Sequence, residues 1–185
     1  MFIDDTFFTN AGQCAERDGR VREVLSYLDA HEIPYRGLCH DEAATIELCE
    51  GIETALGAPI VKNLFLANQQ KTAFYLLIMP GRKPFKTKYL SKQIGSARLS
   101  FGDPENMLRL LNVTPGSASI FSLLFDTGRQ VRLLVDSEVP KLPEIGFHPC
   151  KNTATLRVKT ADVLDRFLPA IGRTAEIVHL PDAGE

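Results

Sequence analysis

The chain has 185 residues, 44% of them hydrophobic and 24% charged, with a formal net charge of −2 at pH 7. These values are typical of a globular protein with one core, and they exclude a protein that coats nucleic acid through overall positive charge. No run of about 18 apolar residues and no signal peptide is present, so we expect a soluble, cytoplasmic, single-domain protein.

Helices are predicted first along the chain. Apolar residues recur at helical spacing between Gly19 and His31, which predicts an amphipathic helix that ends before Pro34. A second, shorter helix is predicted from Thr45 to Leu56, and the Gly57-Ala58-Pro59 turn marks its end.

The hydrophobic period then changes to that of strands. Two apolar runs, Ile60 to Ala67 and Ala73 to Met79, flank a polar turn and predict a β-hairpin whose second strand is buried on both faces. Tyr89 to Ile94 is predicted as a helix, and Arg98 to Phe101 as a short strand.

A helix and a second hairpin are predicted next. Asp103-Pro104 supplies an N-cap and a first-turn proline for a helix that runs to Leu111. After the Thr114-Pro115-Gly116 turn, the runs Ile120 to Phe125 and Val131 to Val135 predict two strands joined by a turn.

The last predicted elements are two strands, Ile145 to Phe147 and Thr153 to Val158, and a helix that Thr160 caps and Gly172 ends. Hairpins interleaved with single helices predict an α+β fold, a single domain with a mixed, largely antiparallel sheet flanked by helices. We expect an amino-terminal extension over residues 1–18, the domain over 19–172 and a carboxyl-terminal tail over 173–185.

Charge is distributed unevenly. No Asp or Glu occurs between Thr54 and Gly102, a stretch with eight lysines and arginines: Lys62, Lys71, Arg82, Lys83, Lys86, Lys88, Lys92 and Arg98. This pattern favours a local surface that binds a polyanion, although an ordinary solvated basic helix would look the same. Three phenylalanines of the stretch, Phe65, Phe74 and Phe101, fall in apolar runs and are predicted to be core.

Common catalytic signatures are absent. The sequence has no phosphate-binding loop, no dinucleotide fingerprint, no Gly-x-Ser-x-Gly elbow and no metal-ligand spacing among its four histidines, so no cofactor and no metal are expected. Cys150 lies two positions after His148, which leaves a Cys/His nucleophile open, but a lone cysteine is more often a small buried hydrophobe.

Three segments are candidates for a site. Lys62 and Asn63 interrupt an apolar strand; an inward Lys62 needs an anion, whereas a lysine at the rim of the strand would extend to water. His148 lies between an aromatic residue and a proline, where it either orients a substrate or is a turn histidine bonded to backbone. The small residues of Thr114–Ser119 either approach an ester carbonyl or simply form a turn.

Taken in order, five motifs resemble those of the YbaK and prolyl-tRNA synthetase-associated editing-domain family, most of all its free-standing ProXp-ala and PrdX trans-editing deacylases. The motifs are Lys62-Asn63-Leu64-Phe65-Leu66, Arg98-Leu99-Ser100-Phe101, Pro115-Gly116-Ser117, Gly146-Phe147-His148-Pro149 and Asn152-Thr153-Ala154-Thr155. The resemblance extends from about Val21 to Ile171 and implies an α+β fold without metal.

The resemblance also implies an activity: hydrolysis of the ester that joins an amino acid to the terminal adenosine of tRNA, with alanine on tRNA for proline as the leading substrate. The expected catalytic residues are Lys62, Gly116, Ser117 and His148. The expected substrate-binding residues are Asn63, Arg98, Ala118, Ser119, Ile120, Gly146, Phe147 and Pro149. Of these, Lys62 matches a lysine that contacts the tRNA 3′ end, Arg98 a basic residue for the acceptor stem, and His148 a histidine of the amino-acid pocket.

One departure from the family concerns specificity. The family loop reads Gly-x-x-x-Pro, whereas this chain has Ile120 in place of the proline, and loss of that restraint would reshape a pocket that selects by size. Alternatives are therefore a deacylase for another small amino acid and a non-catalytic nucleic-acid-binding module. The expected partners are the acceptor stem and aminoacylated 3′ end of tRNA and, transiently, prolyl-tRNA synthetase; no membrane partner is expected.

Overall fold

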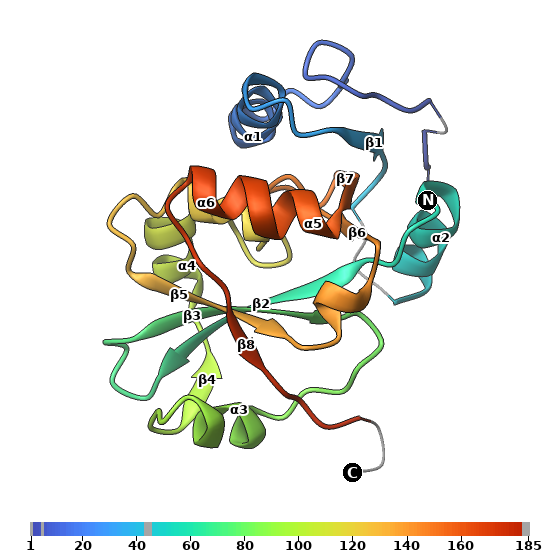
Figure 1. Ribbon diagram of the computed structural model, residues 1–185. Coiled ribbons are helices and arrows are strands. Elements are labelled where there is room, and N and C mark those ends of the chain that lie inside the picture. The colour runs from blue at the N-terminus through green and yellow to red at the C-terminus, as the bar shows by residue number, and fades with distance from the viewer. Residues whose placement is uncertain (1, 5, 43–45, 183–185) are drawn as a thin grey trace.

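The computed structural model describes residues 2–4, 6–42 and 46–182, in which helices surround two β-sheets (Figure 1). The helices are α1 Gly19–Ala30, α2 Ile46–Leu56, α3 Thr87–Gln93, α4 Pro104–Leu111, α5 Thr160–Asp162 and α6 Leu168–Ala170. The strands are β1 Tyr35–Cys39, β2 Val61–Asn68, β3 Phe74–Pro80, β4 Leu99–Phe101, β5 Val131–Asp136, β6 Glu144–Phe147, β7 Ala154–Lys159 and β8 Glu176–Val178. Short 3₁₀ helices span Ile120–Leu124 and Val139–Lys141, and a π-helical segment spans Val163–Phe167.

The sheets confirm the predicted mixed α+β fold. A three-stranded antiparallel sheet has the order β1-β7-β6, and a five-stranded sheet has the order β4-β2-β3-β5-β8. In the larger sheet, β2 pairs antiparallel with β3 and β4, whereas β5 pairs parallel with β3 and β8. The first hairpin is therefore as predicted.

Helices cover both faces of the five-stranded sheet (Figure 1). The main core joins one face of this sheet to α1, α4 and the helical segment from α5 to α6. The other face packs against α3, where Leu90 and Leu99 join a second cluster with Leu66. Because β3 contributes to both clusters, six of its seven residues are buried, as the sequence predicts.

Local sequence signals explain where the long helices begin and what they bury. The Asp18 carboxylate accepts the backbone N–H of Arg20 at the start of α1, and the buried side chains of this helix lie at the predicted spacing. Asp103 caps α4 by accepting the N–H of Asn106, with Pro104 in the first turn. For the second predicted helix, the described part is Ile46–Leu56, and Thr45 lies outside the described residues.

The second predicted hairpin is wrong in its first strand. Ile120–Leu124 is a 3₁₀ helix, and β5, its supposed partner, instead pairs parallel with β3. Ser119 caps the short helix by accepting the N–H of Phe121, and the hydroxyl of Ser122 donates to the Ser119 carbonyl. A short, mostly apolar run does not distinguish a buried strand from a buried helical turn, and the contacts of Ser119 and Ser122 favour the helical turn.

The last predicted helix begins differently from the prediction. Thr160 is its first residue rather than its cap, and its buried hydroxyl has no hydrogen-bond partner among the described residues. The N–H of Leu168 bonds to the carbonyl of Val163, a π-type step, one residue before Pro169, which lacks an N–H. Gly172, with φ of 68°, ends the helix as predicted.

Both predicted flanks contribute to the sheets. Ile3 and Phe8 form bridges to His40 and Gly37 at β1, and β8 lies within the range predicted as a tail. Residues 183–185 of that tail lie outside the described residues. In the described ranges, no helix has the length and apolarity needed to span a bilayer.

Candidate active site

A cavity of about 670 Å³ lies along one edge of β2. Its walls come from α2, the Gly81-Arg82 turn after β3, the junction of β4 and α4, the turn after α4, and His148 just after β6. This volume is in the range of small-molecule sites, and most of the wall is apolar, with a few polar groups between.

The cavity occupies a part of β2 that has a strand on one side only. β3 accompanies β2 along nearly its whole length, whereas β4 pairs only with Leu66–Asn68. At the other end, Ile60 is bridged to Gly146 of β6. Residues 61–64 therefore form an open edge, in the sense that no described strand pairs with them on the β4 side.

Backbone groups point into this open edge. The carbonyl of Phe65 accepts the N–H of Gly102 on the β4 side at 2.9 Å. Because backbone directions alternate along an antiparallel strand, the N–H and carbonyl of Asn63 point to the same side. The open edge thus presents peptide groups as well as side chains to the cavity.

Lys62 lies in the cavity wall and is half-buried. Its Nζ donates a hydrogen bond to the carbonyl of Lys83 at 2.9 Å, and no carboxylate within salt-bridge distance is described. Burial lowers the pKa of the Lys62 ammonium from its usual value, because desolvation disfavours the charged form. Lys62 is thus a partly desolvated cation without an anion at the surface of a cavity.

The turn after α4 forms the opposite wall. Thr114-Pro115-Gly116-Ser117 is closed by a bond from the N–H of Ser117 to the carbonyl of Thr114 at 3.0 Å. Gly116 has φ of 85°, which a type II turn requires at its third position and which glycine adopts without strain. The N–H groups of Gly116 and Ala118 have no hydrogen-bond partner among the described residues, and both residues line the cavity.

Asn63 joins the two walls. Its Oδ1 accepts the N–H of Ile120 at 2.9 Å, and its Nδ2 donates to the carbonyl of Val61 at 3.1 Å. A proline in place of Ile120 would have no N–H to donate, so here a hydrogen bond supplies a restraint on the loop that a proline ring would otherwise supply. Asn63 is therefore a brace for the loop as well as a cavity residue.

His148 has a defined tautomer. Its Nδ1 lies 3.0 Å from the carbonyl of Ala154, so Nδ1 carries the proton and donates it there, and Nε2 has no partner among the described residues. The Thr155 hydroxyl lies 3.2 Å from the same Nδ1 and 2.8 Å from Nε2 of His40. Burial lowers the pKa of His148 to about 4, so the ring is neutral at pH 7 and can accept a hydrogen bond at Nε2.

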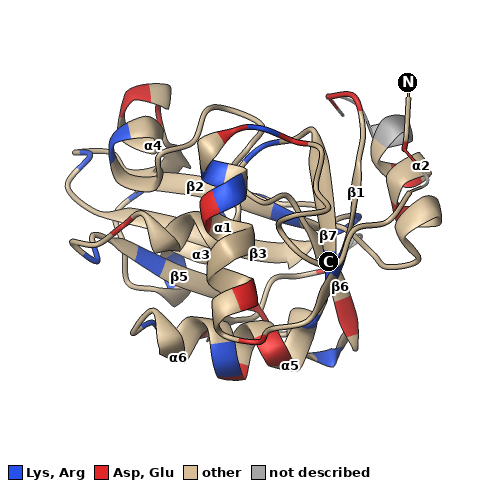
Figure 2. Ribbon diagram, turned by 90° about the horizontal axis from the view of Figure 1, so that it is seen from above, with Lys and Arg blue, Asp and Glu red and all other residues tan. Residues whose placement is uncertain are grey.

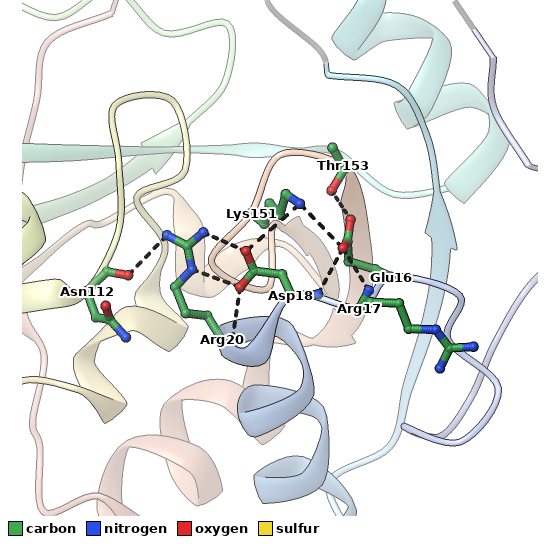
Figure 3. A network of polar contacts seen from close by, with 7 residues as sticks. All are labelled: Glu16, Arg17, Asp18, Arg20, Asn112, Lys151 and Thr153. Carbon is green, nitrogen blue, oxygen red and sulfur yellow. Dashed lines mark hydrogen bonds and ion pairs between the residues drawn. The ribbon is translucent and has the colours of Figure 1, made fainter.

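Polar contacts from the amino-terminal segment hold the chain that follows His148 (Figure 3). Glu16 accepts a hydrogen bond from the Thr153 hydroxyl and lies 3.4 Å from Nζ of Lys151. Burial alone would raise the pKa of Glu16, but the Thr153 hydrogen bond and the nearby charge of Lys151 lower it overall. The carboxylate is thus held ionised against the loop between β6 and β7.

The same network reaches the chain before the Gly116 turn (Figure 3). The Asp18 carboxylate lies 2.6 Å from Nη2 of Arg20, and Arg20 donates to the carbonyl of Asn112 at 3.3 Å. The hydrogen bond from Arg20 lowers the pKa of Asp18 to about 2. Residues 16–20 therefore contact both the loop that follows His148, at Lys151 and Thr153, and the chain that precedes the Gly116 turn, at Asn112.

The structure brings together some of the predicted site residues and leaves others outside the cavity. The residues that line it are Lys62, Asn63, Gly116, Ala118 and His148. The residues buried behind its walls are Ser117, Ser119, Ile120, Gly146, Phe147 and Pro149. Arg98 is exposed and precedes Leu99, which pairs with Asn68 at the far end of β2, about 20 Å along the strand from Lys62.

The Cys/His alternative finds no support in the environment of Cys150. Its side chain is fully buried, and burial raises the pKa of the thiol far above its usual value. Cys150 is therefore a small buried hydrophobic residue, the second of the two possibilities that the sequence left open. Within the described ranges, no group of three His, Cys, Asp or Glu side chains could hold a metal ion.

Part of the basic stretch is neutralised by carboxylates of the same chain. Lys71 pairs with Asp103 at 3.0 Å, Arg82 with Glu50 and Glu53 at 3.6 and 3.7 Å, and Lys83 with buried Asp136 at 3.1 Å. Helix α2, which carries these two glutamates, shows red and no blue in Figure 2 and forms an acidic wall of the cavity. The Lys83–Asp136 pair joins residues 53 positions apart, a separation that hydrophobic periodicity does not reveal.

One aromatic prediction is wrong. Phe65 and Phe74 are buried as predicted, but Phe101 is 65% exposed and lines the cavity. The next residue, Gly102, packs against the Phe65 ring so closely that a Cβ atom would lie 2.2 Å from it. β4 has only three residues and ends just before this glycine, so its last side chain, Phe101, lies at the rim of the cavity. The apolar character of the run does not indicate this exposure.

Comparison with known proteins shows the family of the chain. The model of a family described as "Aminoacyl-tRNA editing domain" matches residues 40–166. The prolyl-tRNA editing protein ProX of Acetoanaerobium sticklandii is 31% identical over 157 residues, covering 85% of this chain and 95% of that protein. The prolyl-tRNA synthetase associated domain-containing protein 1 of Xenopus laevis is 31% identical over 164 residues, with coverages of 85% and 95%.

A solved structure supports the fold. The crystal structure of a candidate trans-editing enzyme for prolyl-tRNA synthetase superposes with a TM-score of 0.66 at 17% identity, covering 91% of this chain and all of that one. At that identity the likeness concerns the fold alone, while the family match spans more than half of the chain. The chain therefore belongs to the aminoacyl-tRNA editing domain family and is an aminoacyl-tRNA deacylase.

Proposed function

We propose that this deacylase removes alanine from mischarged tRNA for proline, and that it recognises the acceptor stem and the aminoacylated 3′ end. The observation that supports this proposal is the cavity at the open edge of β2, where Lys62, the Gly116 turn and His148 converge. The relative ProX is named as a prolyl-tRNA editing protein, which favours tRNA for proline as the carrier.

The reaction requires little from the protein because an aminoacyl ester is already activated. Water adds to the carbonyl carbon, the bond from that carbon to the ribose oxygen breaks, and this oxygen takes a proton, which releases the amino acid and the tRNA. In our proposal the N–H groups of Gly116 and Ala118 stabilise the developing oxyanion. The neighbouring ribose hydroxyl helps to activate the water, so no nucleophilic side chain is needed.

Lys62 and His148 bind the substrate in this proposal. The Lys62 ammonium has no carboxylate partner in the described part of the chain and is partly desolvated, so a terminal phosphate or ribose oxygen is a suitable partner. Neutral His148 accepts a hydrogen bond at Nε2, for which the ammonium group of the bound amino acid is the matching donor.

Selection of alanine over proline is proposed to rest on size. One methylene in an apolar pocket discriminates by only about 1–3 kcal/mol, so steric exclusion has to add to lost contacts. Asn63 restrains the Gly116–Ile120 loop through the Ile120 N–H, which keeps that wall from yielding to a larger side chain. The acceptor stem supplies the remaining specificity, since phosphate contacts position a nucleic acid and base contacts specify it.

The test is the deacylation rate of the purified protein on tRNA for proline charged with alanine, proline, serine or cysteine. We expect alanine to be lost fastest. Loss of another amino acid would overturn the alanine assignment, and absence of hydrolysis for all four would leave the nucleic-acid-binding module.

The role of Lys62 is tested with one variant and a matched control. Replacing Lys62 with alanine is expected to lower kcat/KM about a hundredfold. Lys159→Ala removes one positive charge from an exposed position at the end of β7, away from the cavity, and should leave the rate unchanged. An unchanged rate for Lys62→Ala would refute the anchoring role.

A further inference from the structure

Phe101 is the most exposed large apolar side chain on the cavity wall. It is 65% exposed and lines the cavity at the end of β4. Exposing an aromatic ring of this size to water is unfavourable, and a ring exposed at the rim of a cavity with a largely apolar wall is available to bind a flat, apolar ligand surface.

The ring lies on the same face of the sheet as Lys62. Phe101 pairs with Leu66 in register, and side chains alternate along a strand, so Leu66, Leu64 and Lys62 share its face. Leu66 and Lys62 are four positions apart along the strand, which is about 13 Å. Phe101 and Lys62 therefore flank the same stretch of the open edge, at a separation that a nucleotide with its ester can span.

A second ring holds Phe101 in place. The Phe85 centroid lies 6.4 Å from that of Phe101 with an interplanar angle of 72°, an edge-to-face contact. Phe85 itself packs against the second hydrophobic cluster and is only partly exposed. The contact fixes the orientation of the Phe101 ring and leaves most of the ring surface uncovered.

Cations without an ion pair among the described residues lie on the elements next to this ring. Of the eight basic residues in the acid-free stretch, Lys71, Arg82 and Lys83 already pair with carboxylates. The exposed cations without an ion pair among the described residues lie on or beside α3 and β4, two elements that contact each other: Lys86, Lys88, Lys92 and Arg98. An exposed ring beside such cations is the combination that binds a single-stranded nucleic acid, through base stacking and phosphate contacts.

We propose that Phe101 is a stacking surface for a nucleobase of the single-stranded 3′ end of tRNA, while the cations beside α3 bind the phosphates of the adjoining strand. This inference rests on the proposed function, because it assumes that the ester lies at the Gly116 turn. It assigns to β4 and α3 a recognition role separate from hydrolysis. Every base can stack on an aromatic ring, so we expect the site to bind a base without specificity for its identity.

A tryptophan reporter tests the stacking directly. The chain contains no tryptophan, so Phe101→Trp introduces one fluorophore at the proposed site and retains an aromatic ring. Titration with the trinucleotide CCA should quench its emission to saturation. The matched control is Ile177→Trp, because Ile177 is also exposed, at 47%, but lies on β8 at the opposite edge of the same sheet; its emission should not saturate. Equal quenching in both variants, or none at Phe101→Trp, would overturn the proposal.

Kinetics separate this inference from the proposed function. Phe101→Leu should raise KM for mischarged tRNA about tenfold with kcat retained, while Phe101→Tyr should keep both values near wild type. An unchanged KM for Phe101→Leu in an active enzyme would overturn the stacking role alone. If the wild-type protein hydrolysed no ester but Phe101→Trp was still quenched by CCA, the proposed function would fail and the base-binding site would stand.

Discussion

The buried ion pair between Lys83 and Asp136 allows a quantitative test of what supports the cavity. The two side chains are 7% and 0% exposed, and the carbonyl of Lys83 holds Lys62. Asp136→Asn keeps an oxygen for the N–H of Glu138, which Oδ1 accepts at 2.9 Å, so the principal change is a buried ammonium without its anion. Loss of one partner of a buried pair costs about 3–5 kcal/mol. Asp182, 3.5 Å from Nζ, remains as an anion for the ammonium and, although it is 80% exposed, offsets part of this cost, so we expect the lower end of the range.

Urea unfolding at pH 7 measures the change in the free energy of unfolding. About 3 kcal/mol corresponds to a fall in Tm of roughly 6–12 °C for a chain of this size. The double variant Lys83→Met with Asp136→Asn removes both charges and should recover at least half of the lost stability. The reasoning is refuted if Asp136→Asn unfolds within about 1 kcal/mol of wild type, or if the double variant is no more stable than the single one.

Three further changes have definite outcomes. Gly116→Ala places a Cβ at φ of 85°, where its nearest neighbour is Asn152 Nδ2 at 3.5 Å, so the expected cost is backbone strain of about 1–2 kcal/mol and not a clash. This strain should lower kcat/KM and cause a small fall in Tm, and unaltered kinetics would contradict this. The kcat/KM of His148→Ala divided by that of the wild type should stay constant from pH 5.5 to 8, because burial lowers the pKa of His148 to about 4. A change in this ratio near pH 6.5, after correction for spontaneous hydrolysis, would show that His148 titrates in this range. The pKa of Asp18 is lowered to about 2 by Arg20, so its stabilisation is present above about pH 4 and is lost as the pH falls through 2. Asp18→Asn keeps the helix cap, so thermal unfolding between pH 5 and 2 should show a shallower loss than wild type, and parallel curves would exclude the ionic contribution.

Local signals allowed most elements to be predicted from the sequence. The Asp103 cap, the glycine stops and the two-sided burial of β3 each act within a few residues, so periodicity and capping rules capture them. The Ile120–Leu124 segment was mispredicted because its helical form depends on serine contacts that an apolar run does not display.

The candidate site was predictable only in part, for a related reason. Lys62 interrupts an apolar strand and Gly116 occupies a turn, so both are visible as local exceptions. The exposure of Phe101 depends on where β4 ends relative to β2, and the burial of Lys83 depends on Asp136 from a distant strand. Such pairings are set by the tertiary fold, and no pattern within a short window predicts them.

The open edge of β2 has a consequence for solubility. A strand edge with unpaired peptide groups is a template on which another chain can add, and natural sheets often place a lysine there to prevent it. Lys62 lies on this edge, so the ammonium proposed to bind substrate also discourages self-association through the same peptide groups. Replacing Lys62 with a neutral, apolar residue would then make the protein more prone to aggregate as well as less active. One charge would thus determine both how tightly the site binds its substrate and how well the strand edge resists pairing with another chain.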